Sequence, residues 1–306
     1  MQRLLASAVL TLSGLIRSFR FHRGKDRFLI PVLSRFAFLK PQFEGATFQC
    51  RELGVVWSLS NFPDIMTRTM LIRGTYQDDV ICALGSLVHA NDVVFDVGAH
   101  HGLMSIMASR LVGPAGKVIA FEPNPASRET MATHLKLNGV ANVSIEPVGL
   151  IDREARLPFY AHPGEYSWNS TLIAEFADHL SKKNVLSIET TTLDNYCERN
   201  HLHPRLIKID TEGSDFLILK GGARVLREDR PHLILELNPV AAASAGTTIE
   251  ELVKFLNDLD YQLFAMRRSL LGHYSFDQKQ PLTAGHLKGN GWLQNVVCIS
   301  QGETSR

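Results

Sequence analysis

The stretch Val93-Val-Phe-Asp96-Val-Gly98-Ala-His-His-Gly102 joins a short apolar run to an acidic residue and a glycine-rich turn. An apolar run of this length is typical of a parallel strand that is buried on both faces. The glycines let the backbone turn sharply, and a helix that begins at Gly102 would present free amide donors. We therefore expect an α/β sheet that binds a ligand outside the carboxyl ends of its strands.

Three other apolar runs end in the same way. They cover residues 118–122, 206–210 and 233–236, and their last residues are Glu122, Asp210 and Glu236. An ionised carboxylate inside a sheet costs several kcal/mol unless it is paired, so we expect all four acids at strand ends. Four acids at one edge of a sheet suggest a ligand that carries positive charge and hydroxyl groups.

From Asn91 onward, strands and helices alternate, which predicts a seven-stranded, mostly parallel α/β sheet with helices on both faces. A Rossmann-like sheet of this kind fits class I methyltransferases and doubly wound dinucleotide-binding proteins alike. Before the sheet, residues 46–72 predict a short hairpin around Gly54. We expect an N-terminal helical extension over residues 1–45 and one main domain over residues 46–306.

The N-terminal segment is apolar over residues 4–16 and basic from Arg17 to Arg27. This apolar run is too short to span a bilayer, which needs about twenty residues. A signal peptide would carry its basic residues before the apolar core, so we expect a cytoplasmic protein. The segment fits a helix packed on the body or on a partner, and it would also suit peripheral contact with an anionic membrane surface.

The composition is that of an ordinary soluble globular protein, with 45% hydrophobic and 21% charged residues. With 32 basic and 31 acidic residues the net charge is +1, so no overall field would attract nucleic acid. The four cysteines form neither a CxxC pair nor a cluster with histidine, which argues against a zinc site or a disulfide framework.

The acid at position 96 distinguishes between possible ligands. It lies two residues before Gly98, where a carboxylate would repel a pyrophosphate but would pair with the ammonium of an amino acid. S-adenosylmethionine carries that ammonium, together with a sulfonium and with a carboxylate for the helix amides. A dinucleotide fingerprint would read GxGxxG, whereas position 100 is histidine. We therefore assign to the cofactor turn Asp96, Gly98, His100 and Gly102.

Glu122 lies twenty residues beyond Gly102, at the end of the adjacent predicted strand. A carboxylate there can accept hydrogen bonds from both hydroxyls of a ribose. NAD and S-adenosylmethionine share that ribose, so Glu122 alone does not separate them. Asn124 is expected near the adenine edge. Asp152 is expected either to accept from the adenine amino group or to serve only as a turn residue.

Period-2 alternation places Lys208 and Asp210 on the same face of one strand. They would form an internal ion pair or a polar wall beside the methyl donor. Together with Lys208, the residues expected to hold an acceptor substrate are Glu212, Glu236, Asn238, Trp168 and Asn169. Packing in the core would suit Trp168 equally well.

For a general base, Asp210 is the first candidate and His101 the second, because the ordinary pKa of histidine lies near neutrality. A metal held by Asp210, Glu212, Glu236 and a histidine is conceivable, since hard cations take oxygen ligands. Acidic residues around a cationic cofactor are the simpler explanation, so we expect no metal.

Most of these residues lie in five ordered motifs. They are VFDVGAHHG at 94–102, IAFEPNPASRETMATHLKLNG at 119–139, TTLDNYC at 191–197, LIKIDTEGSDFLILKGG at 206–222 and RPHLILELNP at 230–239. In them the chain resembles the FkbM family of S-adenosylmethionine-dependent methyltransferases, over a recognisable core at residues 74–239. Three positions depart from the usual family pattern: His100 replaces a common Asn, Asp215 replaces Glu, and Tyr76-Gln-Asp-Asp replaces Tyr-Glu-Pro.

The resemblance implies an S-adenosylmethionine-dependent O-methyltransferase that acts on a hydroxyl of a small molecule, a sugar or a glycan. Two other functions stay open on the sequence alone. An NAD-dependent oxidoreductase would share Glu122 but should tolerate loss of Asp96. A non-catalytic S-adenosylmethionine-binding module would keep the crevice but lack an acceptor pocket.

Overall fold

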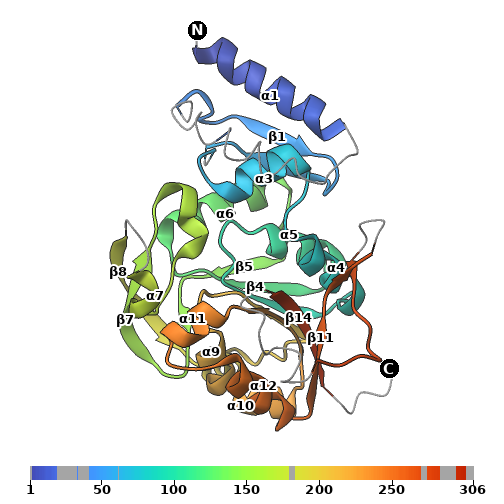
Figure 1. The fold of residues 1–306 in the computed structure, drawn as a ribbon, viewed down its shortest axis with the longest axis vertical. Coiled ribbons are helices and arrows are strands. Elements are labelled where there is room, and N and C mark those ends of the chain that lie inside the picture. Colours follow the sequence, from blue (N-terminus) through green and yellow to red (C-terminus); the bar gives the residue numbers. More distant parts are fainter. Residues whose placement is uncertain are drawn as a thin grey trace.

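The computed structural model of the protein describes residues 2–18, 33, 41–60, 62–178, 183–269, 274–282 and 294–300. Its centre is a seven-stranded sheet in the order β11-β14-β10-β9-β3-β4-β5 (Figure 1). Paired strands run parallel except at β14, which lies antiparallel to β10 and β11. The predicted seven-stranded, mostly parallel sheet is therefore confirmed. The strands are β3 Val93–Val97, β4 Lys117–Phe121, β5 Val143–Glu146, β9 Leu206–Ile209, β10 His232–Leu237, β11 Tyr261–Ala265 and β14 Gln294–Ser300.

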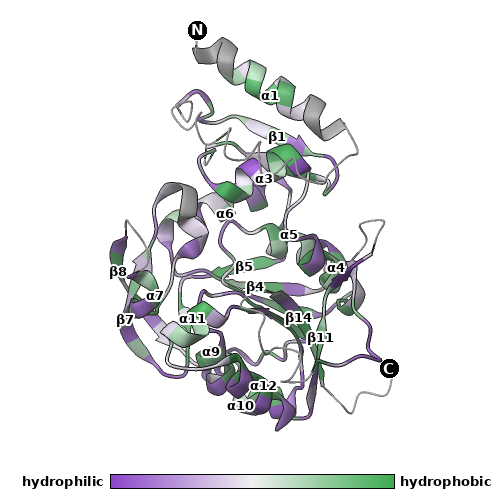
Figure 2. Cartoon of the chain, in the orientation of Figure 1, coloured by the Kyte–Doolittle hydropathy of each residue, from purple (hydrophilic) through white to green (hydrophobic). Residues whose placement is uncertain are grey.

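Helices cover both faces of this sheet, because alternate residues of each strand point to opposite sides. Val94 and Leu206 pack on one face with α4 to α6, whereas Phe95 and Ile207 pack on the other with α8 to α10 and α12. Figure 2 shows hydrophobic colouring in strands of the main sheet such as β4 and β5. The helices are α4 Asp78–Leu87, α5 Leu103–Val112, α6 Pro125–Leu137, α8 Leu193–Asn200, α9 Asp215–Gly221, α10 Ala223–Glu228 and α12 Ile249–Asn257.

The chain before the sheet forms a separate layer at one end of the molecule (Figure 1). It contains the helix α1 Gln2–Ser18, the hairpin β1 Thr47–Cys50 and β2 Val55–Ser58, and the helix α3 Ile65–Arg73. The helical extension and the hairpin were expected from the sequence, whereas α3 was missed. The helix α1 packs against α3 and buries Ala6 and Val9.

For the N-terminal segment we expected basic residues that suit an anionic membrane surface and an apolar run too short to span a bilayer. Most of its basic residues, at 20–27, lie outside the described residues. Within the described ranges, no helix is both long enough and apolar enough to cross a membrane.

A small three-stranded sheet lies beside the main sheet, with β8 Asn184–Thr191 between β6 Gly149–Leu150 and β7 Ala155–Ala161. The 3-10 helix η2 Gly164–Asn169 and the helix α7 Ala174–Ala177 lie between β7 and β8, and α11 Pro239–Ser244 follows β10. The short strands β12 Arg267–Arg268 and β13 Tyr274–Ser275 pair near the C-terminus. The segment from Asp215 to Glu228 forms two helices, α9 and α10.

Candidate functional site

The turn after β3 and the turn after β9 touch through a glycine. Gly98 has φ +76, and a Cβ at this position would lie 1.9 Å from the carbonyl oxygen of Asp210. Any other residue would therefore be strained by its backbone and would also clash with the neighbouring turn. This contact brings Asp210 beside the start of the predicted cofactor turn.

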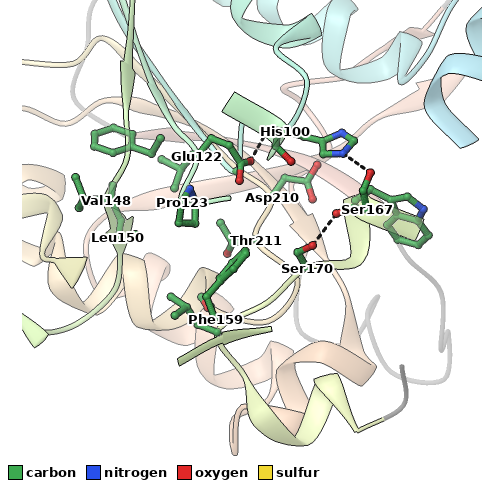
Figure 3. Close-up of a pocket in the computed structure, with 18 residues that line it drawn as sticks. His100, Glu122, Pro123, Val148, Leu150, Phe159, Ser167, Ser170, Asp210 and Thr211 are labelled. Atoms are coloured by element: carbon green, nitrogen blue, oxygen red, sulfur yellow. Dashed lines mark hydrogen bonds between the residues drawn. The ribbon is translucent and has the colours of Figure 1, made fainter. Parts of the chain in front are cut away.

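A first cavity of about 560 Å³ opens at this point. Figure 3 shows its two ends: Val148 and Leu150 line an apolar end, and His100 and Asp210 lie at a polar end. Glu122 lies between them. An elongated ligand with one apolar part and one polar part fits such a wall.

The Glu122 carboxylate is held by two backbone amides. The amide of His100 donates to Oε2 and the amide of Asn124 donates to Oε1, each at 2.8 Å. Burial raises the pKa of Glu122 to about 7, although these two hydrogen bonds act in the opposite direction. Glu122 lines the first cavity, and its role as partner of a ribose stays a prediction.

Three polar side-chain atoms on the wall of the first cavity have no hydrogen-bond partner among the described residues. They are Thr211 Oγ1, Ser214 Oγ and Trp168 Nε1, and all three are buried. A buried polar atom without a partner costs about 1–3 kcal/mol, so a wall with three such atoms fits a ligand that carries polar groups. S-adenosylmethionine, with its carboxylate, ammonium and ribose, meets this condition.

A second cavity of about 1230 Å³, including its open mouth, adjoins the first. Its wall combines residues from the N-terminal layer with residues from the sheet. From the N-terminal layer come Met66, Thr69 and Arg73, and from the sheet edge come Lys208 and Glu236. Four residues line both cavities: Gly98, His100, Trp168 and Asp210. The two cavities therefore meet at Asp210 and His100.

A buried ion pair lies under this meeting point. Lys208 Nζ is 3.1 Å from Asp96 Oδ1 and 3.6 Å from Asp210 Oδ2, and it donates to the carbonyl of Gly98 at 3.1 Å. Burial alone would lower the pKa of Lys208, but the carboxylates of Asp96 and Asp210 raise it above the ordinary value. The predicted pairing of Lys208 with Asp210 on one strand face is thus present in the structure.

The placement of Asp96 differs from the expectation. Asp96 lies inside β3 and not at its end, beside Lys208 in the register of β3 with β9. Its second oxygen accepts from Ser105 Oγ at 2.6 Å. These partners explain how a carboxylate can be buried within the sheet. Asp96 lines neither of the two cavities, so it acts on the site through Lys208.

Three acids gather on the floor of the second cavity. Asp210, Glu212 and Glu236 each place a carboxylate oxygen within 4.8 Å of the others. Burial, followed by repulsion from Asp210 and Glu212, raises the pKa of Glu236 to about 10. Burial and Asp210 likewise raise the pKa of Glu212 well above its usual range. Both glutamates therefore have a raised pKa and bind a proton more readily than a solvent-exposed glutamate does.

Besides Asp96, three residues predicted to bind the cofactor do not line the first cavity. Gly102 has φ +84, and a Cβ there would lie 2.6 Å from Met131 Cγ, so this glycine lets α5 approach α6. Asn124 is the N-cap of α6 and accepts from the Ala126 amide at 3.1 Å. Asp152 pairs with the guanidinium of Arg153 at 2.8 Å. The side chains of Asn124 and Asp152 are thus engaged in local contacts, and Gly102 serves the packing of two helices.

Three residues predicted for the acceptor or for catalysis also lie outside the two cavities. Asn238 is the N-cap of α11, and Asn169 is the last residue of η2. His101 is buried behind His100, with the two ring centroids 3.6 Å apart. A general base has to reach the substrate, so this position gives His101 no direct path to it.

The sequence analysis missed several residues at the site. Gln77 donates to Asp210 Oδ2 at 3.3 Å, and Ser167 lines the first cavity. Asp64, at the start of α3, accepts a hydrogen bond from Ser167. An aspartate followed by a helix is a common N-cap, and that signal would have revealed both α3 and Asp64.

The sheet and its flanking helices give the Rossmann-like α/β fold of class I methyltransferases. The protein-family model of the methyltransferase FkbM domain matches residues 96–263 of the sequence. The chain therefore belongs to the FkbM methyltransferase family, as its five motifs led us to expect.

Known relatives resemble the chain over part of their length. Methyltransferase 1 of Beauveria bassiana (strain ARSEF 2860) is 25% identical over 144 residues, which make up 42% of this chain and 57% of the fungal protein. The chain thus spans little more than half of that relative. Hexuronic acid methyltransferase AglP of Haloferax volcanii is 25% identical over 189 residues, 61% of this chain and 70% of AglP. The crystal structure of methyltransferase FkbM from Methylobacillus flagellatus KT has 14% identity and a TM-score of 0.45, and the match covers 90% of this chain and 59% of that one.

Proposed function

We propose that the protein is an S-adenosylmethionine-dependent O-methyltransferase that methylates a hydroxyl of a small molecule or a carbohydrate. The observation that carries this proposal is the meeting of two cavities at Gly98, His100, Trp168 and Asp210. A transferase needs a donor and an acceptor side by side, and a binding module for one ligand would need only the first cavity.

The first cavity would hold S-adenosylmethionine. Its apolar end at Val148 and Leu150 suits the adenine, and Glu122 suits the two ribose hydroxyls. The unpartnered atoms of Thr211 and Ser214 offer hydrogen bonds to the polar groups of the ligand. When bound, S-adenosylmethionine supplies a methyl group on a positively charged sulfur.

The role predicted for Asp96 as partner of the ligand ammonium passes to Asp210 in this proposal. Asp96 is occupied by Lys208 and Ser105, whereas the Asp210 side chain lines both cavities. A carboxylate there would attract the cationic end of the ligand.

The second cavity would hold the acceptor. Its floor carries Glu212 and Glu236, whose raised pKa favours the protonated form that can donate a hydrogen bond to a hydroxyl oxygen. Such a wall suits a ligand with several hydroxyls, and the relative AglP is named for a hexuronic acid. We therefore place sugars and glycans first among the acceptor classes.

Most of the rate would come from positioning. Holding the acceptor oxygen in line with the methyl carbon, about 3 Å away, converts a bimolecular reaction into an intramolecular one. Gly98 and Asp210 fix this geometry, because the contact between their turns leaves no room for movement toward each other.

The test has a binding step and a transfer step. Titration calorimetry of the full chain is expected to show binding of S-adenosylmethionine and S-adenosylhomocysteine but not of NAD. Incubation with methyl-labelled S-adenosylmethionine and glucuronic acid, galacturonic acid or glucose is then expected to yield a labelled sugar. Binding of NAD in place of S-adenosylmethionine would refute the proposal, and binding without transfer to any hydroxyl compound would favour a binding module.

A further inference from the structure

A chain of hydrogen bonds leads from the cavity wall into the protein. His100 lines both cavities, and its Nε2 lies 2.9 Å from Ser167 Oγ (Figure 3). The Ser167 hydroxyl in turn donates to Asp64 Oδ2 at 2.9 Å. Asp64 is buried at the start of α3, where its other oxygen accepts from the Thr67 amide at 3.2 Å. The chain thus connects the meeting point of the cavities with a buried carboxylate.

The direction of these hydrogen bonds follows from the number of hydrogens. A serine hydroxyl has one hydrogen to donate, and an ionised carboxylate can only accept. Ser167 gives its hydrogen to Asp64, so it must accept the hydrogen on His100 Nε2. The neutral imidazole then keeps a free lone pair on Nδ1. Within the described residues, no group donates to that nitrogen.

The charges around the chain favour movement of a proton toward Asp64. Burial, followed by the charges of Lys208 and His134, lowers the pKa of His100 to about 3. Burial raises the pKa of Asp64 to about 6, although hydrogen bonds from Thr67 and Ser167 oppose this change. A proton is therefore held far better by Asp64 than by His100. The imidazole can pass a proton on without becoming charged, by accepting at Nδ1 while it donates from Nε2.

The backbone at His100 gives an independent reason to assign this residue a role. His100 has φ +49, a left-handed conformation that Asn adopts more readily than most other residues. Asn is also the residue that the motif resemblance leads us to expect at this position. Strain of this kind clusters at functional sites, where the surrounding structure holds the residue in place.

We propose that His100, Ser167 and Asp64 form a proton relay for methyl transfer, an inference that rests on the function proposed above. As the acceptor oxygen bonds to the methyl carbon, the carbon–sulfur bond breaks and its electron pair stays on sulfur. The hydroxyl proton passes to His100 Nδ1, the Nε2 proton passes to Ser167, and the Ser167 proton passes to Asp64. His100 is the catalytic residue, and Ser167 and Asp64 are positioning residues that act through it.

In this scheme Asp210 has a different task from the one first predicted. Its carboxylate lies beside the Lys208 ammonium and accepts from Gln77, so two partners fix its orientation. Asp210 therefore orients the ligands, while the proton leaves through His100.

The tautomer of His100 tests the relay without any ligand. In nitrogen-15 NMR spectra of the free full-length chain near neutral pH, His100 is expected to be neutral with its hydrogen on Nε2. The variant His100→Asn assigns the signal. His134 serves as an internal reference, because its Nδ1 lies 2.9 Å from the His101 carbonyl and must carry its hydrogen there.

The variant Asp64→Asn is expected to reverse the tautomer. Asn is as good an N-cap as Asp, so α3 keeps its start. In this variant the side-chain oxygen of Asn accepts from the backbone amide of Thr67, so the side-chain NH2 faces Ser167 and donates to its Oγ. Ser167 must then donate its own hydrogen to His100 Nε2. The His100 hydrogen moves to Nδ1, and the His134 signal stays unchanged. In Ser167→Ala, which leaves Asp64 untouched, the two tautomers of His100 are expected to mix.

Three results would overturn the relay. They are a hydrogen on His100 Nδ1 in the unmodified chain, a charged His100 imidazole near neutral pH, and a His100 tautomer that stays unchanged in both Asp64→Asn and Ser167→Ala. If NMR shows the expected tautomers but calorimetry shows no binding of S-adenosylmethionine, the proposed function is overturned. The role of the relay in methyl transfer is then overturned with it. The NMR and calorimetric measurements thus separate the two failures.

Discussion

Replacing Lys208 by Met should strongly destabilise the protein. The side chain of Lys208 is 5% exposed and that of Asp96 is 2% exposed, and their charged atoms lie 3.1 Å apart. Met keeps the length of the side chain but removes the ammonium, so among the described residues Asp96 keeps the hydroxyl of Ser105 as its side-chain partner. Removal of one partner from a buried ion pair costs about 3–5 kcal/mol, because the other charge stays buried without compensation. We expect a loss of that size in the free energy of unfolding.

Guanidinium unfolding followed by both tryptophan fluorescence and far-UV circular dichroism measures this loss, and agreement of the two signals supports a two-state analysis. The double variant Asp96→Asn, Lys208→Met removes both charges of the Lys208–Asp96 pair. Its loss in free energy of unfolding should be smaller than the sum of the losses of the two single variants. Lys254→Met is the matched control: its ion pair with Asp258 is also short, at 2.5 Å, but Lys254 is 74% exposed. That control should cost less than about 1 kcal/mol. A similar small loss for Lys208→Met would refute the reasoning.

Three further predictions concern the cavities. Gly98 and Gly139 both have positive φ, but a Cβ would lie 1.9 Å from a carbonyl oxygen at Gly98 and would meet nothing within 4 Å at Gly139. Gly139→Ala should therefore lower the free energy of unfolding by about 1–2 kcal/mol, and Gly98→Ala should lower it by clearly more. Equal losses would contradict the close contact at Gly98. Burial raises the pKa of Glu122 from 4.5 to about 7, so between these values the folded state binds more protons than the unfolded state and stability falls as the pH rises. In Glu122→Gln this part of the pH dependence, at most about 3 kcal/mol, should vanish, and an unchanged pH profile of unfolding would show that Glu122 ionises normally. Asp210→Asn should weaken binding of S-adenosylmethionine in calorimetry at least about tenfold, since it loses the charge placed beside the ligand ammonium, and methyl transfer should fall with it; unchanged binding would remove Asp210 from that role.

The sheet could be predicted because its strands have simple patterns. Each parallel strand is a short apolar run, and period-2 alternation within one run was enough to pair Lys208 with Asp210. The position of Asp96 inside its strand could not be predicted, because its partner Lys208 comes from a strand more than a hundred residues later.

The errors at the site also have physical causes. The helix α3 is buried on every side from Met66 to Ile72, so it lacks the polar face that reveals a helix in a sequence. Asn124 and Asn238 follow strands at the ligand edge, but each also begins a helix. The same residue type serves as N-cap and as ligand contact, and only the fold shows which use applies. The link from Ser167 to Asp64 joins two segments about a hundred residues apart, beyond the reach of any local pattern.

The second cavity is built from two parts of the chain. Its floor comes from the sheet edge, within the residues that the family model matches, whereas Ile65, Met66, Thr69 and Arg73 come from α3, outside that match. Substitutions in α3 would reshape one wall of the second cavity, while the residues that line only the first cavity would stay as they are. In the proposed function, one short helix would therefore tune the choice of acceptor separately from the binding of the methyl donor.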